Sequence, residues 1–260
     1  MRFVGIEAIK KREQSDFTIY TKDDKSLVTN VDYWANDQII TFLQNAFPSH
    51  IVIGEESQDK SYPKNAPFVW YVDPIDGTKQ FTQGEDHFYI LVGLAVNGIP
   101  EYGFFYKPTE DLFIHTDSST SITIDMKGFN IDNPIINWQK PGSLVLKYVN
   151  ADQKLFIDDH FEQKKHSYIQ EMVSQMGPIF KESNGYLGFR RTYFWDICAP
   201  AAIMSKLGFQ HAYFDIEGNP MVMNSGLVKC RSHFSLPSDA PIELITWFEN
   251  EAKQLPQELA

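Results

Sequence analysis

The run Phe68-Val69-Trp70-Tyr71-Val72 leads directly into Asp73-Pro74-Ile75-Asp76-Gly77-Thr78. Five apolar residues bounded by polar ones are typical of a short buried strand. The turn that follows carries two carboxylates three residues apart, and the proline between them stiffens the backbone so that both can converge on one point. Mg²⁺ prefers such oxygen ligands. The alternative is an Asx turn without a ligand, because Asp-Pro and Asp-Gly pairs are common in turns.

Two other residues of this turn suit a phosphate ester. Gly77 lets the backbone approach a ligand closely, and exposed N–H groups there can bind phosphate oxygens. The hydroxyl of Thr78 can orient a water molecule. Two metal ions that share one carboxylate are a common arrangement in phosphoryl transfer. The segment therefore predicts a site for metal ions and phosphate.

Further carboxylates follow apolar runs elsewhere in the chain. Glu55 and Glu56 come after Ile51-Val52-Ile53, and Asp196 opens an apolar helix after Phe194-Trp195. Taken alone, a Glu-Glu pair in a loop is usually solvated and an Asp before a helix is usually an N-cap. Together they supply what a two-metal site still needs, namely one more ligand for each metal and a general base.

The composition limits the classes of protein to consider. The 260 residues are 43% hydrophobic, which is typical of a globular chain with a sizeable core. A net charge of −11 and the lack of a Lys/Arg-rich stripe argue against a nucleic-acid polymer as partner. Because no run of about 18 apolar residues predicts a membrane span and residues 1–11 lack a signal peptide's apolar run, we expect a soluble, cytoplasmic protein.

Neither cysteines nor histidines indicate a site of their own. Cys198 and Cys230 form no Cys-x-x-Cys pair and predict no disulfide framework. The seven histidines show no zinc-binding spacing.

The order of elements predicts mainly strands first and alternating helices and strands later. A helix is expected from Asp32, as its N-cap, to Pro48. Further helices are expected at about 152–164, 167–176, 196–207 and 241–253. The expected strands are residues 51–53, 68–72, 88–95, 102–106, 112–115, 121–125, 144–149 and 210–216, with those between 88 and 125 forming an antiparallel meander. We expect one compact unit, with an N-terminal α+β half (1–130) that carries most metal ligands and a C-terminal α/β half (131–260) that lines the substrate pocket.

Three motifs, in this order, resemble the signature of the inositol monophosphatase superfamily: Gly54-Glu55-Glu56-Ser57, Asp73-Pro74-Ile75-Asp76-Gly77-Thr78-Lys79-Gln80-Phe81 and Trp195-Asp196. Residues 22–32 also resemble the family's loop ending in V-T-x-x-D, and residues 214–220 its later strand and turn. The likeness spans roughly residues 20–115 and 190–220. It implies the αβαβα layered sandwich (α+β and α/β) of inositol monophosphatase-like sugar phosphatases, a small phosphorylated substrate, and a possible homodimer.

The resemblance also implies a role for each motif residue. Two or three Mg²⁺ ions per site would be held by Glu55, Asp73, the backbone carbonyl of Ile75, Asp76 and Asp196. Thr78, paired with Asp32 and close to Glu55, would position and deprotonate the attacking water. The backbone N–H groups of Gly77 and Thr78 would grip the phosphate. Hydrolysis would require Mg²⁺ and be inhibited by Li⁺.

Lys79 favours one branch of the superfamily. The pattern G-T-K-x-F resembles the 3′(2′),5′-bisphosphate nucleotidases, whereas inositol monophosphatases usually have G-T-x-N-F. This implies removal of the 3′-phosphate of adenosine 3′,5′-bisphosphate. An inositol monophosphatase or another sugar-phosphate phosphatase is the nearest alternative, and a non-catalytic phosphate-binding relative is a further one. A haloacid dehalogenase is excluded, since its D-x-D-G-T motif has one residue between the carboxylates and this chain has two.

The second half departs from the family pattern. Leu146-Lys147-Tyr148-Val149-Asn150 stands where the family has an S-R-S-H-like tetrad, and residues 177–194 keep little of the pattern. We take Arg190 and Arg191 as candidates for a second phosphate of the substrate. The neighbouring aromatic residues are expected to pack in the core rather than stack on a base.

Overall fold

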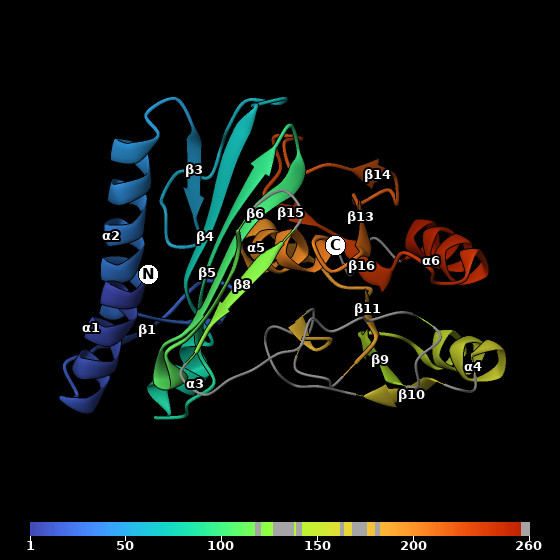
Figure 1. Ribbon diagram of the computed structural model, residues 1–260, viewed down its shortest axis with the longest axis horizontal. Coiled ribbons are helices and arrows are strands. Elements are labelled where there is room, and N and C mark those ends of the chain that lie inside the picture. The colour runs from blue at the N-terminus through green and yellow to red at the C-terminus, as the bar shows by residue number, and fades with distance from the viewer. Residues whose placement is uncertain are drawn as a thin grey trace.

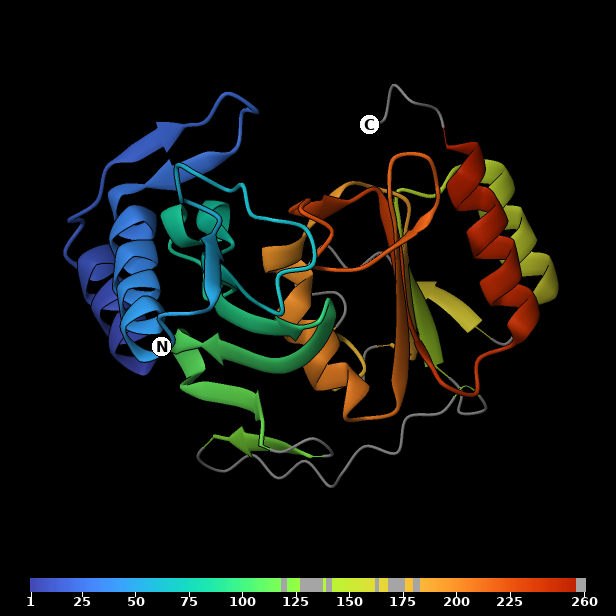
Figure 2. The same ribbon diagram turned by 90° about the horizontal axis from the view of Figure 1, so that it is seen from above.

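The computed structural model describes residues 1–117, 121–126, 138, 142–161, 164–167, 176–179 and 183–255. Figure 2 shows five layers: helices α1 and α2, a first sheet, helix α5, a second sheet, and helices α4 and α6. This confirms the αβαβα sandwich expected from the sequence. Each sheet is thus covered on both faces, which is how such layers bury their apolar surfaces.

The first sheet contains the Asp73 turn and has the strand order β3-β4-β5-β6-β7-β8. Only β3 and β4 pair in parallel, and β4 to β8 form the expected antiparallel meander. The strands are β3 (Ile51–Gly54), β4 (Phe68–Asp76), β5 (Tyr89–Val96), β6 (Ile99–Lys107), β7 (Leu112–Thr116) and β8 (Ile122–Asp125). The short elements along its edge are α3 (Thr78–Thr82) and the 3₁₀ turn Pro108–Glu110.

Alternation along the strands places two different cores on the two faces of this sheet. Trp70 and Val92 pack with α1 (Arg2–Glu13) and α2 (Asn30–Ala46) on the outer face. Tyr71 and Leu91 belong to the clusters that include α5 on the inner face. A hairpin of β1 (Ile19–Thr21) and β2 (Leu27–Thr29) leads into α2.

The start of α2 corrects one expectation. Thr29, not Asp32, is the N-cap, and its side chain accepts hydrogen bonds from the backbone N–H groups of Val31 and Asp32. Asp32 occupies the third helical position and its carboxylate accepts from the backbone N–H of Thr29 at 2.9 Å. Together they form a reciprocal capping box, for which the sequence pattern is a Thr three residues before an acidic residue.

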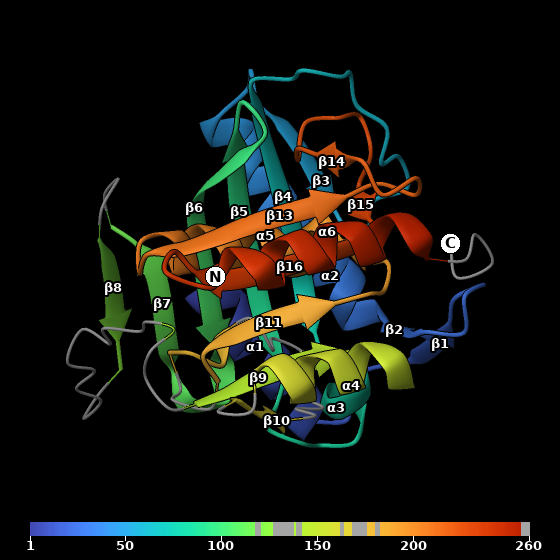
Figure 3. The ribbon, with the colours of Figure 1, turned by 90° about the vertical axis from the view of Figure 1, so that its right-hand side faces the viewer.

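The second sheet has the order β10-β9-β11-β16-β13-β14, and α4 (Ala151–His160) and α6 (Ile242–Gln254) lie on its outer face (Figure 3). Strands β9 and β11 are parallel neighbours, whereas β11, β16 and β13 pair in antiparallel. The strands are β9 (Gly142–Lys147), β10 (Lys164–Ser167), β11 (Gly185–Gly188), β13 (Phe209–Phe214), β14 (Pro220–Met221) and β16 (Ser232–Pro237). A separate ribbon pairs β12 (Thr192–Tyr193) with β15 (Lys229–Cys230).

One helix prediction is wrong at its end near residue 164, and a second lies mostly outside the described residues. The helix expected at 152–164 ends at His160, and Lys164–Ser167 instead forms β10 beside β9. The helix expected at 167–176 begins with a residue of this strand, and residues 168–175 lie outside the described part of the chain. The sequence around Lys164 is polar throughout, so hydrophobic periodicity could not separate a strand from a helix there.

Helix α5 (Phe194–Ser205) is the central layer and touches β5 and β6 through glycines (Figure 1). A Cβ atom on Gly103 would lie 2.2 Å from the carbonyl oxygen of Ala199, and one on Gly93 would lie 2.6 Å from its nitrogen. Such distances leave no room for a methyl group, because the neighbouring atoms are backbone. Helix α5 therefore packs against the sheet at a distance so short that only glycine fits at these two positions.

We accordingly expect Gly103→Ala to destabilise the protein by about 1–3 kcal/mol through overpacking. Urea denaturation measures the change, and Gly84→Ala serves as the control because no atom lies within 4 Å of its would-be Cβ. Since Gly84 has φ +77°, Ala there introduces backbone strain alone. A Gly103→Ala variant as stable as wild type would contradict the close approach of α5.

Two histidines, the buried His233 and the partly buried His211, lie on the face of the second sheet that looks toward α5. The register pairs His233 with Tyr213 and His211 with Ser235, so all four side chains share that face. The ring of His233 stacks on Tyr186 with centroids 4.8 Å apart, and its residue is 1% exposed. Burial lowers the pKa of His233 to about 3 and that of His211 to about 4.

These shifts predict a loss of stability in acid. A histidine kept neutral in the fold but protonated in the unfolded chain contributes stability above its unfolded pKa of about 6.5, and this stability falls as the pH drops toward the folded pKa. Between pH 6.5 and 5, each contributes a fall of roughly 2 kcal/mol. We expect the free energy of unfolding of His233→Gln, measured by denaturation, to fall less between pH 6.5 and 5 than that of wild type. His160→Gln, a substitution at an exposed position, should show the same fall as wild type.

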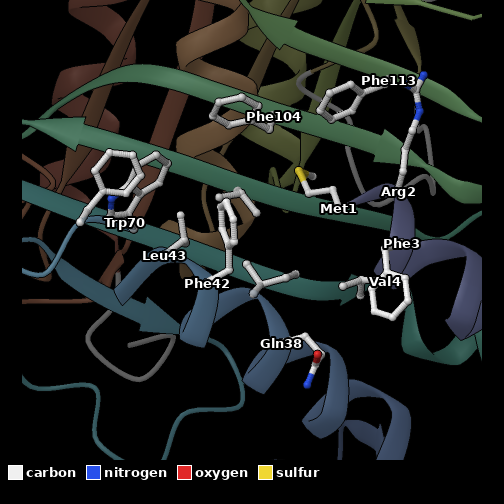
Figure 4. A pocket seen from close by; sticks show the side chains of 13 residues that line it. Met1, Arg2, Phe3, Val4, Gln38, Phe42, Leu43, Trp70, Phe104 and Phe113 are labelled. Atoms are coloured by element: carbon white, nitrogen blue, oxygen red, sulfur yellow. The ribbon is translucent and has the colours of Figure 1, made fainter. Parts of the chain in front are cut away.

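The outer face of the first sheet also holds an apolar hollow of about 700 Å³ between α1, α2 and strands β4 to β7. Figure 4 shows the aromatic rings of Phe42, Trp70, Phe104 and Phe113 around it. None of the candidate site residues lines it. Among the described residues, no helix is long and apolar enough to cross a membrane.

Candidate metal and phosphate site

A bulge at the end of β4 brings Asp73 and Asp76 to the same side. Asp73 lies opposite Leu91 and Asp76 opposite Tyr89, so two residues on β4 face a single one on β5. Residues three apart in a regular strand point to opposite faces, and the extra residue restores a common face. The carboxylate of Asp73 also accepts a hydrogen bond from the backbone N–H of Ile75 at 3.1 Å, which is the Asx turn.

Gly77 ends the turn in a backbone conformation that other residues adopt only under strain. Its φ is +102°, and a Cβ there would lie 2.8 Å from the carbonyl oxygen of His87. The glycine is therefore needed both for its conformation and for its close neighbour. Directly after it, Thr78 opens α3.

Thr78 connects this turn to the start of α2. Its hydroxyl lies 2.8 Å from Oδ1 of Asp32 and 3.2 Å from the carbonyl oxygen of Ile75. Asp32 is 1% exposed, and burial raises the pKa of its carboxyl although hydrogen bonds from Thr29 and Thr78 oppose the rise. The hydroxyl and the carboxylate thus form a fixed pair at the edge of the site.

The carboxylates act on one another across three segments of chain. Burial and then repulsion from Glu55, Asp76 and Asp196 raise the pKa of Asp73 well above its ordinary value. Burial and repulsion from Asp76 and Glu55 do the same for the pKa of Asp196, in the first turn of α5. Burial and Glu55 raise the pKa of Asp76 to about 7. Such a concentration of buried negative charge is unfavourable unless cations balance it.

Pro200 lies inside α5, four residues after Asp196. Because proline has no N–H, the carbonyl of Asp196 lacks its usual helical donor. This carbonyl is a further oxygen close to the carboxylate.

Lys22 is the first site residue that sequence reasoning missed. It lies in the β1–β2 loop, and its Nζ is 2.8 Å from Glu55 and 2.6 Å from Glu56. Burial opposes its charge, but these two carboxylates together raise its pKa. Burial and repulsion from Glu55 raise the pKa of Glu56 to about 7. Only the sequence position of Lys22, before the capping box of α2, could have indicated this contact.

Lys147 is the second missed residue. It ends β9, and its pKa is lowered by burial while Asp76 acts in the opposite direction and Arg190 adds to the lowering. Arg190 stacks on Tyr148, with the guanidinium 4.5 Å from the ring centroid, and hydrogen-bonds its hydroxyl. Tyr148 has φ +59°, an uncommon conformation for a tyrosine. The parallel strands β9 and β11 thus deliver a lysine and an arginine from their carboxyl ends, where ligands bind in α/β sheets.

The other candidate site residues lie away from the carboxylates or have structural roles. Lys79 is exposed on α3. Arg191 directly precedes strand β12 and does not share the Tyr148 contact of Arg190. The aromatic residues expected in the core are buried there: Tyr186, Phe189, Phe194 and Trp195. Tyr193 is partly buried and stacks on Trp195 with centroids 4.3 Å apart.

The donor set fits divalent metal, although the side chains do not form a closed shell around one point. In the described part of the chain, no three side chains of Asp, Glu, His or Cys are gathered tightly enough to enclose an ion. The carboxylate of Glu55 is paired with Lys22. What fits is the chemistry: the candidate ligands are carboxylates that repel each other and a backbone carbonyl, and none is a sulfur or an imidazole. Such oxygen ligands suit a hard cation such as Mg²⁺.

An αβαβα sandwich with carboxylates at the ends of β3 and β4 and at the start of α5 defines the class of layered sugar-phosphatase folds. The chain belongs to the Inositol monophosphatase family, whose model matches residues 2–240. The three motifs noted in the sequence lie within this match.

Curated relatives match parts of the chain. The bifunctional phosphatase IMPL2 of Arabidopsis thaliana is 37% identical over 39% of this chain and 30% of its own length. Inositol-1-monophosphatase of Bacillus subtilis is 34% identical over 45% and 44%. The 3′(2′),5′-bisphosphate nucleotidase CysQ of Buchnera aphidicola is 27% identical over 75% and 74%. Among the first four relatives, the match spans only 30% to 44% of their length.

Solved structures support the fold. A crystal structure of an IMPase/NADP phosphatase with Mg²⁺ and phosphate has a TM-score of 0.70 at 18% identity and covers 94% of this chain and 90% of its own. At such low identity the likeness establishes the architecture alone.

Proposed function

We propose that this chain is a Mg²⁺-dependent phosphomonoesterase. The observation that carries the proposal is the convergence of the buried carboxylates of β4 with partly buried ones from the β3 end and α5, beside a Thr78–Asp32 pair. Glu55, Asp73, Asp76, Asp196 and the carbonyl of Ile75 would hold two or three Mg²⁺ ions. When bound, the metal would make water a better nucleophile and neutralise charge on the leaving oxygen.

Residues of the chain itself orient the attacking water and accept its proton. The hydroxyl of Thr78 accepts a hydrogen bond from the attacking water when its own proton points to Asp32, 2.8 Å away. Asp32 can then take up the proton, because burial already raises the pKa of its carboxyl. The backbone N–H groups of Gly77 and Thr78 would bind the phosphate oxygens. Lys147, close to Asp76, would add positive charge on the leaving-group side.

We infer further that the substrate is adenosine 3′,5′-bisphosphate, from which the 3′-phosphate is removed. This finer assignment is supported by the G-T-K pattern at Lys79, by the Buchnera nucleotidase with its long match, and by the cations Lys147 and Arg190 close to Asp76. The higher identity to the Bacillus enzyme favours inositol monophosphatase activity as the second candidate.

A phosphate-release panel distinguishes these assignments. We expect adenosine 3′,5′-bisphosphate to be hydrolysed with a higher kcat/KM than inositol 1-phosphate and fructose 1,6-bisphosphate, with Mg²⁺ required and Li⁺ inhibitory. Preference for inositol 1-phosphate would support the second candidate. No Mg²⁺-dependent hydrolysis of any ester would leave a non-catalytic phosphate-binding relative and reject the enzyme assignment.

A further inference from the structure

The β12–β15 ribbon gathers positive charge at one end. Tyr193 pairs with Lys229 and Thr192 with Cys230, so Arg191, which directly precedes β12, and Arg231, which directly follows β15, lie at the same end of the ribbon. The charge of Arg191 acts on both Lys229 and Arg231, which places the three cations close together. Lys229 lies opposite Tyr193 in the ribbon.

This arrangement is electrostatically unfavourable as it stands. Burial and then repulsion from Arg191 lower the pKa of both Lys229 and Arg231. Within the described part of the chain, neither Arg191 nor Lys229 forms an ion pair with a carboxylate. In a chain of net charge −11, three cations gathered at one end of a two-stranded ribbon need a physical reason.

The cations are held in place rather than free to move apart. Arg231 is 4% exposed and its Nη1 donates a 2.6 Å hydrogen bond to the carbonyl of Ile216. The Nζ of Lys229 lies 5.6 Å from the ring centroid of Tyr193, which itself stacks on Trp195. Preorganised cations of this kind suit a compact anion with several oxygens.

The ribbon borders the carboxylate site. Strand β12 leads straight into α5, whose third residue is Asp196, and the charge of Asp196 contributes to the raised pKa of Cys230 on β15. The neighbouring Arg190 points elsewhere, onto Tyr148. An anion on the ribbon would therefore lie close to, but apart from, a phosphate at the metal ligands.

We propose that Arg191, Lys229 and Arg231 form a binding site for a phosphate or sulfate group carried at the far end of the substrate. This deepens the proposed function and rests on it, because the same molecule would present a second phosphate to the metal ligands. The proposal also gives different roles to the two arginines that were both candidates from the sequence. Arg191 binds the phosphate or sulfate group at the far end of the substrate, and Arg190 does not.

The first test needs no catalysis. We expect metal-free protein, freed of chelator, to bind inorganic sulfate in calorimetry at constant ionic strength, and Arg191→Gln and Lys229→Met each to weaken that binding about tenfold or more. Lys253→Met on α6 is the matched control and should bind as wild type does. Without sulfate, the ribbon variants should melt no earlier than wild type, since each removes a repelling charge. Equal sulfate binding by all four proteins would reject the site.

The second test assigns the anion to the substrate. Arg191→Gln should raise KM for adenosine 3′,5′-bisphosphate about tenfold and leave KM for adenosine 3′-monophosphate within twofold. Two outcomes would overturn the assignment to the substrate and indicate a site for a free anion. One is an equal change in KM for both substrates, and the other is weakened sulfate binding with both KM values unchanged. If no ester is hydrolysed, the proposed function fails while the sulfate measurement still decides whether the ribbon binds anions.

Discussion

Replacing Asp76 by Asn should abolish nearly all Mg²⁺-dependent phosphatase activity and at the same time stabilise the metal-free protein. Asp76 is 7% exposed, and burial and Glu55 raise its pKa to about 7. A metal contact in phosphoryl transfer is worth several kcal/mol, so kcat/KM should fall by about 10³-fold or more. Without metal, the amide removes one charge from a group of carboxylates that repel each other.

The opposite signs of these two effects separate metal binding from folding. Calorimetry should show weaker Mg²⁺ binding by Asp76→Asn, and thermal melts should show a smaller gain from added Mg²⁺ than in wild type. Asp37→Asn, on the exposed surface of α2, is the control and should change neither quantity. If Asp76→Asn lowered the melting temperature of metal-free protein and left Mg²⁺ affinity intact, Asp76 would be a structural residue and not a ligand.

The first half of the fold was predictable because its signals are local. The apolar runs at β3 and β4 and the meander β5 to β8 alternate and end at turns, so the strands were found within a few residues of their observed bounds. In the second half, β11, β12, β15 and β16 were missed. They are short or, like β16 with Ser232, His233 and Ser235, carry buried polar residues that hide the apolar pattern.

The candidate site shows a similar division. Acidic residues at strand ends were found because their position in the sequence reveals them, and Thr78 with Asp32 because the resemblance paired them. Lys22 and Lys147 were missed, since nothing in a polar loop or at the end of one strand tells which carboxylate a lysine will meet. Nor could the sequence show that a bulge turns Asp73 and Asp76 to one side, or that Arg190 and Arg191 diverge.

Replacing Thr78 by Val should reduce kcat by about 10²–10⁴-fold and leave KM and Mg²⁺ affinity almost unchanged. Valine keeps the shape of the side chain but lacks the hydroxyl that lies 2.8 Å from Asp32, so the attacking water would lose both its orientation and its path for the proton. Thr78→Ser keeps a hydroxyl and should recover most of the rate. Stability should fall by about 1–2 kcal/mol, because buried Asp32 loses one donor while the hydrogen bonds from Thr29 remain.

The control for Thr78→Val lies one turn further along the same short helix. Thr82 donates its hydroxyl to the carbonyl of Lys79 at 2.8 Å and is exposed, so Thr82→Val should cost little stability and no activity. Steady-state kinetics at saturating Mg²⁺ separates the two cases. A rise in KM with kcat intact in Thr78→Val would assign the hydroxyl to substrate binding and remove the basis for a Thr78–Asp32 proton path. Equal losses in Thr78→Val and Thr82→Val would show instead that α3 must simply be intact, because the two residues share the helix and only Thr78 contacts Asp32.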